Sequence, residues 1–280
     1  MNRLPTVFFV GPERTGTTWI HQYLGWRGDV RLPTATKETF FFDRFFHRGV
    51  EWYLSHFEAD AGQPLVAEVA PTYFHSERAA ARIAETAPGA LVVCTLRDPV
   101  KRSYSAYQHM VAYGVTASPL RDAVREHPQI IAASRYAEQV QRWRDQFGVR
   151  RVHLLLLDDL AADGERFARE LCNIVGLPPR APPQDLREER VNATGAPRNP
   201  RLARLGFWLR GPLRRARLFG LIALARRTGL HQLFFGVRPQ GGNAADDDLR
   251  FLREQLAGEV ERTEVLLGRE LPQWRTQADP

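Results

Sequence analysis

The sequence predicts an α/β fold in which helices flank a central parallel sheet of about four or five strands. Two observations support this class. Short apolar runs rich in β-branched residues or leucine recur in the first part of the chain, and amphipathic helical patterns separate them. Strands that alternate with helices are typical of parallel sheets covered on both faces. A helical region is expected at the C-terminal end.

The predicted elements alternate regularly along this part of the chain. The expected strands are residues 7–10, 65–69, 91–96 and 152–157. The expected helices are residues 17–27, 77–87, 99–112, 134–147 and 163–175. Ligands of open parallel sheets bind beyond the carboxyl ends of the strands. We therefore expect a site at the turns that follow Val10 and Leu96.

The character of the chain changes after residue 177. A proline-rich loop, LPPRAPPQDL, comes before a stretch from Arg198 to Arg238 that holds ten arginines and no acidic residue. Gly211-Pro212 divides this basic stretch into two expected helical pieces. A second loop with three aspartates then leads into an amphipathic closing helix over residues 249–268.

The composition is that of an ordinary globular protein with an excess of positive charge. The 280 residues are 44% hydrophobic and 25% charged, and the net charge is +7. Lysine occurs only at Lys37 and Lys101, so nearly all of the positive charge is arginine. A basic balance favours anionic ligands such as nucleotides, nucleic acids, acidic glycans or membrane surfaces, without selecting one of them.

Three features predict a soluble, cytoplasmic protein. Cys94 and Cys172 lie in apolar contexts far apart in the sequence, which is typical of buried reduced thiols in a reducing compartment. The N-terminal residues lead into an apolar strand rather than a secretory leader. The uncharged run LFGLIALA near residue 220 is far shorter than the roughly 20 residues of a membrane span.

The most informative stretch is VFFVGPERTGTT at residues 7–18. It predicts a strand, a tight loop and a helix start, which direct backbone N–H groups at one anion. The spacing of Gly11 and Gly16 is that of an ATP-type P-loop and indicates a P-loop-like three-layer fold. Thr17 stands where that motif needs lysine, and the positive charge lies upstream at Arg14. We predict a cradle for the 5′-phosphate of a nucleotide that is not handled as ATP with Mg²⁺.

A second motif, LRDPVKRSYSAYQH at residues 96–109, follows the expected third strand. Arg97 lies at the strand end, and Ser105 lies about two turns into the next helix. An arginine fork and a hydroxyl group at these positions can bind one phosphate. Beside the first loop, the pair indicates a second phosphate site.

Together, GPERTGTTW and LRDPVKRSYSAYQH resemble the two-part signature of sulfotransferases that use 3′-phosphoadenosine 5′-phosphosulfate (PAPS), in their heparan-sulfate-type and bacterial branch. The first element is that family's 5′-phosphosulfate loop, and the second is its 3′-phosphate site. Further segments similar to that branch are TKETFFFD at 36–43, EVAPTYF at 68–74, SRYAEQVQRWRDQFG at 134–148 and LLGRELPQW at 266–274. The resemblance covers residues 5–178 and 245–274.

The resemblance implies a set of nucleotide-binding residues. They are Arg14, Thr15, Gly16, Thr17, Thr18, Arg97, Ser105 and Arg198. Arg14 would sit on the bridging oxygen and stabilise the leaving phosphate, and the rest of the loop would supply N–H and hydroxyl donors. Arg97 and Ser105 would hold the 3′-phosphate, and Arg198 belongs to a late basic loop that would close over it.

A general base must take the proton of the acceptor. Glu38 matches the family's Lys-Glu position and is the first candidate, with Lys37 beside it to bias the carboxylate or touch the sulfuryl group. An exposed charge pair is the alternative interpretation of these two residues. His109, on the helix of the second motif, is the second candidate base. Tyr73 and Phe74 either line the acceptor cleft or belong to the core.

Two positions depart from the family's pattern. Arg14 stands where the family usually has lysine, and Val69 stands where heparan-sulfate enzymes often carry a lysine that contacts the substrate. Arginine keeps the charge and adds a planar fork. Val69 argues against a heparan-type acceptor.

We therefore expect one sulfotransferase domain over residues 1–280. Its parts are a nucleotide-binding core (1–178), a loop with a basic helical insertion (179–245) and a closing helix with a tail (246–280). The expected reaction is in-line transfer of the sulfuryl group of PAPS to an acceptor, which leaves adenosine 3′,5′-bisphosphate (PAP). The acceptor is expected to be a hydroxyl, with an amine less favoured, of a glycan, a lipid-linked molecule or a natural product. The family requires no metal, and the sequence shows no convincing cluster of metal ligands.

Two other classes of function stay open at this point. One is an ATP-dependent P-loop kinase, and the other is a non-enzymatic polyanion-binding protein driven by its arginines. No nucleic-acid partner is expected of the sulfotransferase. The basic segment 200–238 lines the acceptor cleft, lies on a membrane surface, or packs its apolar face on the core.

Overall fold

The computed structural model describes residues 3–57, 62–188, 196–197, 237–238 and 244–275. Backbone contacts divide the chain into two compact units. The first unit comprises Met1–Pro99, Ala133–Val191 and Gly258–Pro280, and the second comprises Val100–Ala132 and Asn192–Ala257. The expected organisation as one domain over residues 1–280 stays a prediction.

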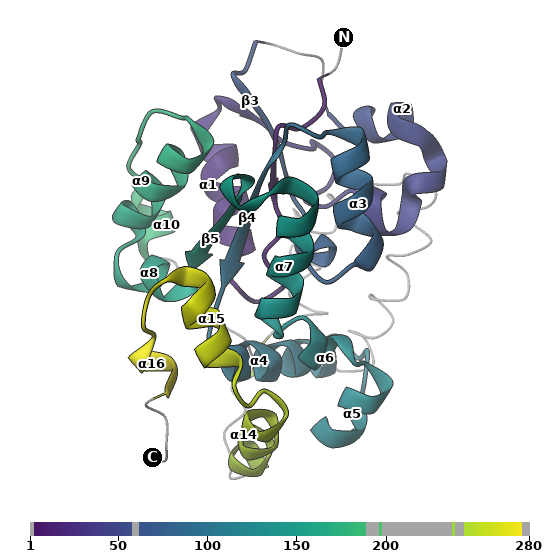
Figure 1. The fold of residues 1–280 in the computed structure, drawn as a ribbon, viewed down its shortest axis with the longest axis vertical. Helices are drawn as coiled ribbons and strands as arrows, with labels where there is room; N and C mark the ends of the chain where they lie inside the picture. The colour runs from purple at the N-terminus through teal and green to yellow at the C-terminus, as the bar shows by residue number, and fades with distance from the viewer. Residues whose placement is uncertain (1–2, 58–61, 189–195, 198–236, 239–243, 276–280) are drawn as a thin grey trace. The chain divides into compact units, whose positions relative to one another are not determined.

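The first unit is built on a five-stranded parallel sheet with the strand order β2-β3-β1-β4-β5 (Figure 1). The strands are β1 (Val7–Phe9), β2 (Val30–Arg31), β3 (Leu65–Val69), β4 (Leu91–Leu96) and β5 (Val152–Leu156). The predicted fold class and the four predicted strands are confirmed, with the first and the last one residue shorter. The sequence does not predict β2, because two residues carry no periodic pattern.

Helices cover both faces of this sheet (Figure 1). One face carries α1 (Thr17–Arg27), α8 (Leu157–Ala162), α9 (Gly164–Val175) and α10 (Gln184–Glu188). The other carries α2 (Gly49–Leu54), α3 (Glu77–Thr86) and α7 (Tyr136–Phe147). Each face has its own apolar core, with Trp19 and Phe167 buried in the first and Phe8 and Trp143 in the second. Burial on both faces explains why the strands are almost entirely apolar.

The five helices predicted between the strands are confirmed as α1, α3, α4 (Pro99–Ala112), α7 and α9. Pro99 is the first residue of α4, where its missing N–H has no helical partner. The sequence does not predict several shorter helices, because so few residues leave no amphipathic period. These are η1 (Phe41–Phe45), η2 (Phe46–Arg48), η3 (Pro71–Tyr73), η4 (Val149–Arg151) and α16 (Pro272–Arg275), together with α2, α8 and α10.

The prediction of one closing helix over residues 249–268 is wrong. The structure has two helices there, α14 (Ala244–Gln255) and α15 (Glu259–Leu267). Gly258 separates them with a left-handed φ of 75°, a conformation that ends a helix and that glycine adopts at little cost. The carboxylate of Glu259 then accepts a hydrogen bond from the backbone nitrogen of Ala137 at 2.8 Å, which fixes the new helix against α7.

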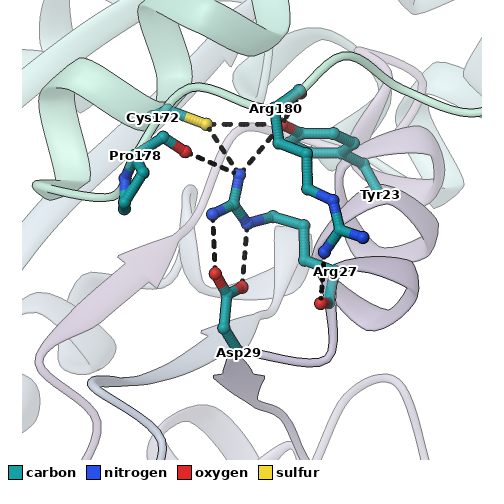
Figure 2. Close-up of polar contacts among 6 residues, drawn as sticks. All are labelled: Tyr23, Arg27, Asp29, Cys172, Pro178 and Arg180. Atoms are coloured by element: carbon teal, nitrogen blue, oxygen red, sulfur yellow. Dashed lines mark hydrogen bonds and ion pairs between the residues drawn. The ribbon is translucent and has the colours of Figure 1, made fainter.

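A buried arginine anchors the C-terminal end of α1 (Figure 2). Arg27 makes a two-pronged ion pair with Asp29, with distances of 2.9 and 2.7 Å. It also donates to the carbonyl of Pro178 at 3.1 Å and to Sγ of Cys172 at 3.2 Å. Arg180 returns a hydrogen bond to the carbonyl of Arg27 at 3.0 Å. A two-pronged contact with this many partners fixes the helix end more firmly than a surface ion pair would.

The second unit contains α5 (Leu120–Glu126), α6 (Gln129–Ala132), α14 and all of α4 after Pro99. Its apolar core is formed by Leu120, Ala123, Ile130, Ile131, Leu252 and Leu256. A two-residue antiparallel ladder joins β6 (Ala196–Pro197) to β7 (Val237–Arg238). The helical pieces predicted within the basic segment fall on residues 198–236, which lie outside the described residues.

Two further expectations concern the thiols and the membrane. Cys94 and Cys172 are buried free thiols, as predicted, and burial raises the pKa of the Cys94 thiol. Within the part of the chain that the structure describes, none of the helices has both the length and the apolar character needed to cross a bilayer.

Candidate active site

The loop between β1 and α1 packs tightly against β4. A side chain at Gly11 would place its Cβ 2.2 Å from Oγ1 of Thr95 and 2.4 Å from the backbone nitrogen of that residue. Only glycine fits there. Thr15 Oγ1 donates to the carbonyl of Pro12 at 2.6 Å and lies 2.9 Å from Thr95 Oγ1. The backbone of the loop at Gly11 and the side chain of Thr15 therefore both contact Thr95 of the neighbouring strand.

The same loop ends as an anion-binding turn. Arg14 and Gly16 adopt left-handed backbone angles, with φ of 76° and 90°. α1 begins at Thr17, and Gly16 at its N-cap has no side chain to accept from the N–H groups of the first turn. The partial positive charge of a helix start adds to these N–H groups, so the geometry suits a phosphate or a sulfate. The predicted strand, loop and helix start are confirmed.

Lys37 brings a positive charge to this turn from a different part of the chain. Its Nζ donates to Oγ1 of Thr17 at 3.2 Å and lies 3.5 Å from Oγ1 of Thr18. Burial lowers the pKa of Lys37, and the nearby carboxylates of Glu38 and Glu13 oppose this effect. Lys37 thus places an ammonium group beside Thr17, the residue that stands where a P-loop carries its lysine.

The alternative prediction of an exposed Lys37–Glu38 charge pair is wrong, because both side chains are half-buried. The backbone carbonyl of Glu38 accepts a hydrogen bond from Oγ1 of Thr36 at 2.9 Å, which fixes the turn on its N-terminal side. A partly enclosed carboxylate near an ammonium group can take a proton from a substrate.

The second motif meets the first at Arg97. Nη1 of Arg97 lies 3.4 Å from the backbone carbonyl of Arg14 and donates to it. The carbonyl of Arg97 in turn accepts from the hydroxyl of Tyr136 at 2.8 Å, which holds the turn after β4 against α7. The structure therefore brings together two arginines that stand 83 residues apart in the sequence.

Three other predicted site residues belong to the second unit or lie outside the described residues. Ser105 is buried on α4, in its second turn as predicted. His109 lies one turn further along α4, and its ring centroid is 4.3 Å from that of Tyr113. Their positions at the 3′-phosphate and as a base stay predictions. Arg198 lies outside the described residues.

Tyr73 and Phe74 belong to the core, since both are fully buried. Of the two interpretations of these rings, the acceptor-cleft interpretation is therefore wrong. The hydroxyl of Tyr73 reaches Glu68, a fully buried acid in β3 that the sequence analysis did not single out. The signal for Glu68 is present in the sequence, because a single acid interrupts the apolar strand LVAEV.

Among the described residues, no three histidine, cysteine, aspartate or glutamate side chains gather in a group that could hold a metal ion. The donors at the turn after β1 are ammonium, guanidinium, hydroxyl and backbone N–H groups. This donor set fits an anionic nucleotide and its sulfuryl group.

Comparison with known proteins agrees with this geometry. The family model described as "Sulfotransferase domain" matches residues 4–194. The bifunctional heparan sulfate N-deacetylase/N-sulfotransferase 1 of Xenopus laevis is 28% identical over 195 residues, which cover 62% of this chain and 21% of that protein. The bifunctional heparan sulfate N-deacetylase/N-sulfotransferase 2 of Homo sapiens is 37% identical over 120 residues, which cover 40% of this chain and 14% of that protein. The chain thus spans about a fifth of the length of the curated relatives it matches first.

Solved structures show the same fold. A sulfotransferase from Alicyclobacillus acidocaldarius superimposes with a TM-score of 0.68 at 21% identity, over 98% of this chain and 99% of that one. The mouse sulfotransferase SULT7A1, solved in complex with PAP, superimposes with a TM-score of 0.50 at 12% identity, over 95% of this chain and 87% of that one. With the fold, the phosphate loop and the family model in agreement, the chain belongs to the sulfotransferase domain family.

Proposed function

We propose that the protein transfers the sulfuryl group of PAPS to an acceptor oxygen and releases PAP. One observation carries the proposal: the start of α1, the ammonium group of Lys37 and the guanidinium group of Arg97 all meet the Gly11–Thr18 turn. A phosphate or a sulfate is the ligand that such a turn favours, and PAPS carries both groups at its 5′ end. Membership of the sulfotransferase domain family supports the same assignment.

In this proposal the residues of the turn bind the 5′ end of the nucleotide. The N–H groups and hydroxyls of Thr15, Gly16, Thr17 and Thr18 hold the 5′-phosphosulfate, and Arg14 neutralises the charge that develops on the leaving phosphate. Arg97, Ser105 and Arg198 hold the 3′-phosphate, which is the group that distinguishes PAPS from ATP. The bound PAPS supplies an activated sulfuryl group, and the chain positions it for in-line attack.

Glu38 is the proposed general base, and His109 is the second candidate. The carboxylate of Glu38 takes the proton of the acceptor hydroxyl as its oxygen approaches sulfur. Lys37 is next to Glu38 in the sequence and contacts the hydroxyls of Thr17 and Thr18, so it can neutralise charge on the transferring group. In an in-line displacement the attacking oxygen and the leaving phosphate lie on opposite sides of sulfur, and Glu38 and Arg14 are the residues proposed to act on the two sides.

We propose a glycan, a lipid-linked molecule or a natural product as the acceptor. The curated relatives are named for heparan sulfate, which supports a glycan, and the net charge of +7 supports an anionic one. Val69 is fully buried and presents no substrate-contacting lysine, which supports a non-heparan glycan. We propose a hydroxyl rather than an amine as the accepting group. The basic segment 200–238 is a candidate for peripheral membrane contact. The two buried free thiols support a cytoplasmic location.

Calorimetric titration and an acceptor screen test the proposal. PAP is expected to bind without Mg²⁺ and more tightly than ATP, and labelled sulfuryl is expected to pass from PAPS to at least one of several acceptors. The panel contains de-N-sulfated heparin, an unsulfated polysaccharide, a glycolipid and small phenols. Preference for ATP with Mg²⁺ would favour the kinase alternative. Binding of any polyanion in a salt-sensitive manner, with neither nucleotide held, would favour the polyanion-binding alternative.

A further inference from the structure

Glu68 is a carboxylate in the middle of an apolar core. It lies in β3 opposite Phe8 of β1, and its side chain is fully buried. Burial raises the pKa of Glu68, whereas hydrogen bonds from Thr39, Tyr53 and Tyr73 favour its charged form. A carboxyl group at such a site is costly unless several donors satisfy it. The residues that donate to Glu68 therefore indicate which part of the structure this carboxylate stabilises.

The donors to Glu68 come from one loop residue, one residue of α2 and one residue of η3. Oε1 accepts from both the backbone nitrogen and Oγ1 of Thr39, at 2.9 and 2.7 Å. Oε2 accepts from the hydroxyl of Tyr53, on α2, at 2.8 Å. The hydroxyl of Tyr73, on η3, lies 3.3 and 3.4 Å from the two carboxylate oxygens. The tightest pair of contacts therefore falls on Thr39, the residue directly after Glu38.

The hydroxyl groups of Thr39 and Tyr73 also accept hydrogen bonds from the backbone of the turn. The backbone nitrogen of Phe41 donates to Oγ1 of Thr39 at 3.2 Å, and that of Phe42 lies 3.4 Å from the hydroxyl of Tyr73. Both hydroxyls are thereby oriented with their protons toward the carboxylate or toward each other, since they also lie 3.1 Å apart. Directly and through these two side chains, Glu68 fixes the backbone N–H groups of Thr39, Phe41 and Phe42, which lie on both sides of Phe40.

The turn needs such support. Phe40 has a left-handed φ of 55°, a conformation that costs a residue with a Cβ on the order of 1 kcal/mol. It persists only where surrounding contacts determine it, and here they converge on Glu68. On the other side of the turn, Lys37 is tied to Thr17 by its own hydrogen bond. The Lys37-Glu38 pair is thus fixed on one side by the contact of Lys37 with Thr17 and on the other by the contacts of Thr39 with Glu68.

We infer that Glu68 is a positioning residue, whose buried carboxylate holds the Thr36–Phe42 turn so that Glu38 and Lys37 face the phosphate loop. This inference rests on the proposed function, because it assigns the purpose of the network to the proposed base. Glu68 itself touches no substrate. It acts through Thr39 on the orientation of Glu38, and its loss misplaces the base rather than the nucleotide.

Glu68→Gln is the first test, because it keeps the volume of the side chain but replaces one acceptor oxygen with an amide donor. Turnover with labelled PAPS and the most active acceptor of the panel is expected to fall about tenfold or more. The dissociation constant for PAP is expected to stay within about twofold, because the loop after β1 is untouched and Lys37 keeps its own hydrogen bond to Thr17. Unchanged turnover in an active protein overturns the inference. A wild-type protein that neither binds PAP nor transfers sulfuryl would instead overturn the proposed function.

A double variant separates positioning from general loosening. If Glu68 acts through Glu38, Glu68→Gln in a Glu38→Gln background is expected to lower turnover no further. Losses that multiply would contradict the inference. Leu65→Ala is the matched control, since it removes buried volume from the same strand in the apolar cluster of the opposite face, which contains no residue of the turn. Turnover in Leu65→Ala is expected to stay near that of the wild type, and an equal loss there would also overturn the inference.

Two measurements keep the test decisive if Glu68→Gln folds poorly or no acceptor is found. Thr39→Val removes the hydroxyl donor at nearly constant shape and is expected to lower turnover, and Thr39→Ser is expected to restore it. Hydrogen exchange requires no acceptor: the segment Thr36–Phe42 is expected to exchange faster in Thr39→Val or Glu68→Gln, while β1 and α1 keep their rates. Unchanged exchange in Thr36–Phe42 would contradict the inference.

Discussion

The guanidinium group of Arg97 donates to the backbone carbonyl of Arg14 at 3.4 Å. This contact joins the turn after β4 to the turn after β1 at the carboxyl ends of two neighbouring strands. Open parallel sheets bind ligands at this edge. The start of the second phosphate motif therefore lies beside the first motif within the first unit, with Arg97 as the point of contact.

The tightness of the phosphate loop can be tested at Gly11. Gly11→Ala would force a Cβ to within 2.2 Å of Thr95 Oγ1, so the loop or β4 must move. We expect the free energy of unfolding to fall by about 1–3 kcal/mol in urea titrations, with weaker PAP binding. Gly89→Ala is the matched control, because a Cβ there meets nothing within 4 Å. Equal stability of the two variants would show that Gly11 does not need its close approach.

Glu38→Gln tests the base. The amide keeps the shape of the side chain but cannot take a proton, so turnover is expected to drop by about a hundredfold or more. The affinity for PAP, measured by calorimetry, should hardly change, because Glu38 is not among the proposed nucleotide-binding residues. Normal turnover in this variant would remove Glu38 from the mechanism and leave His109 as the candidate.

Arg14→Ala and Lys37→Ala test the division of charge at the loop. Arg14 is proposed to stabilise the leaving phosphate, whereas Lys37 contacts the hydroxyls of Thr17 and Thr18 from outside the loop. We therefore expect Arg14→Ala to reduce turnover more than Lys37→Ala when both are measured at saturating PAPS. The opposite order would exchange the roles of the two cations.

The pH dependence of PAP binding reports on Lys37. Burial lowers its pKa from the ordinary value of 10.5, so the ammonium group loses its proton at a lower pH than a free lysine would. Only the charged form attracts a phosphate, so PAP affinity is expected to fall as pH rises through this lowered pKa. Lys37→Arg should keep its charge and remove that alkaline loss. An identical alkaline loss in Lys37→Arg would assign it to another group.

The parts of the site that the sequence predicts are those carried by local pattern. The strand, the Gly11–Gly16 turn and the start of α1 follow from residue type and spacing, and the structure confirms all three. The break of the closing helix at Gly258 follows from one backbone angle, which no periodicity reports. The fold was therefore predictable except at short elements and at the break that Gly258 makes between α14 and α15.

The parts that the sequence does not predict depend on contacts over long separations. Lys37 reaches Thr17 across 20 residues, and Glu68 reaches Thr39 across 29. Such contacts depend on the order of the strands in the sheet, where β3 lies beside β1, and no local pattern in the sequence reports that order. A lone acid in an apolar strand is visible in the sequence, but the three hydroxyl-bearing side chains around Glu68 become neighbours only on folding.

The central claim is that the protein grips its nucleotide at the 5′ end and at the 3′ end, with Arg97 on the 3′-phosphate. Calorimetry with PAP and with adenosine 5′-phosphate, which lacks the 3′-phosphate, tests this most directly in the wild type and in Arg97→Ala. We expect the wild type to prefer PAP strongly, and Arg97→Ala to reduce that preference by about tenfold or more. Arg150→Ala, at an exposed arginine of η4, should leave it intact. Equal affinity of the wild type for both nucleotides, or an unchanged preference in Arg97→Ala, would contradict the account.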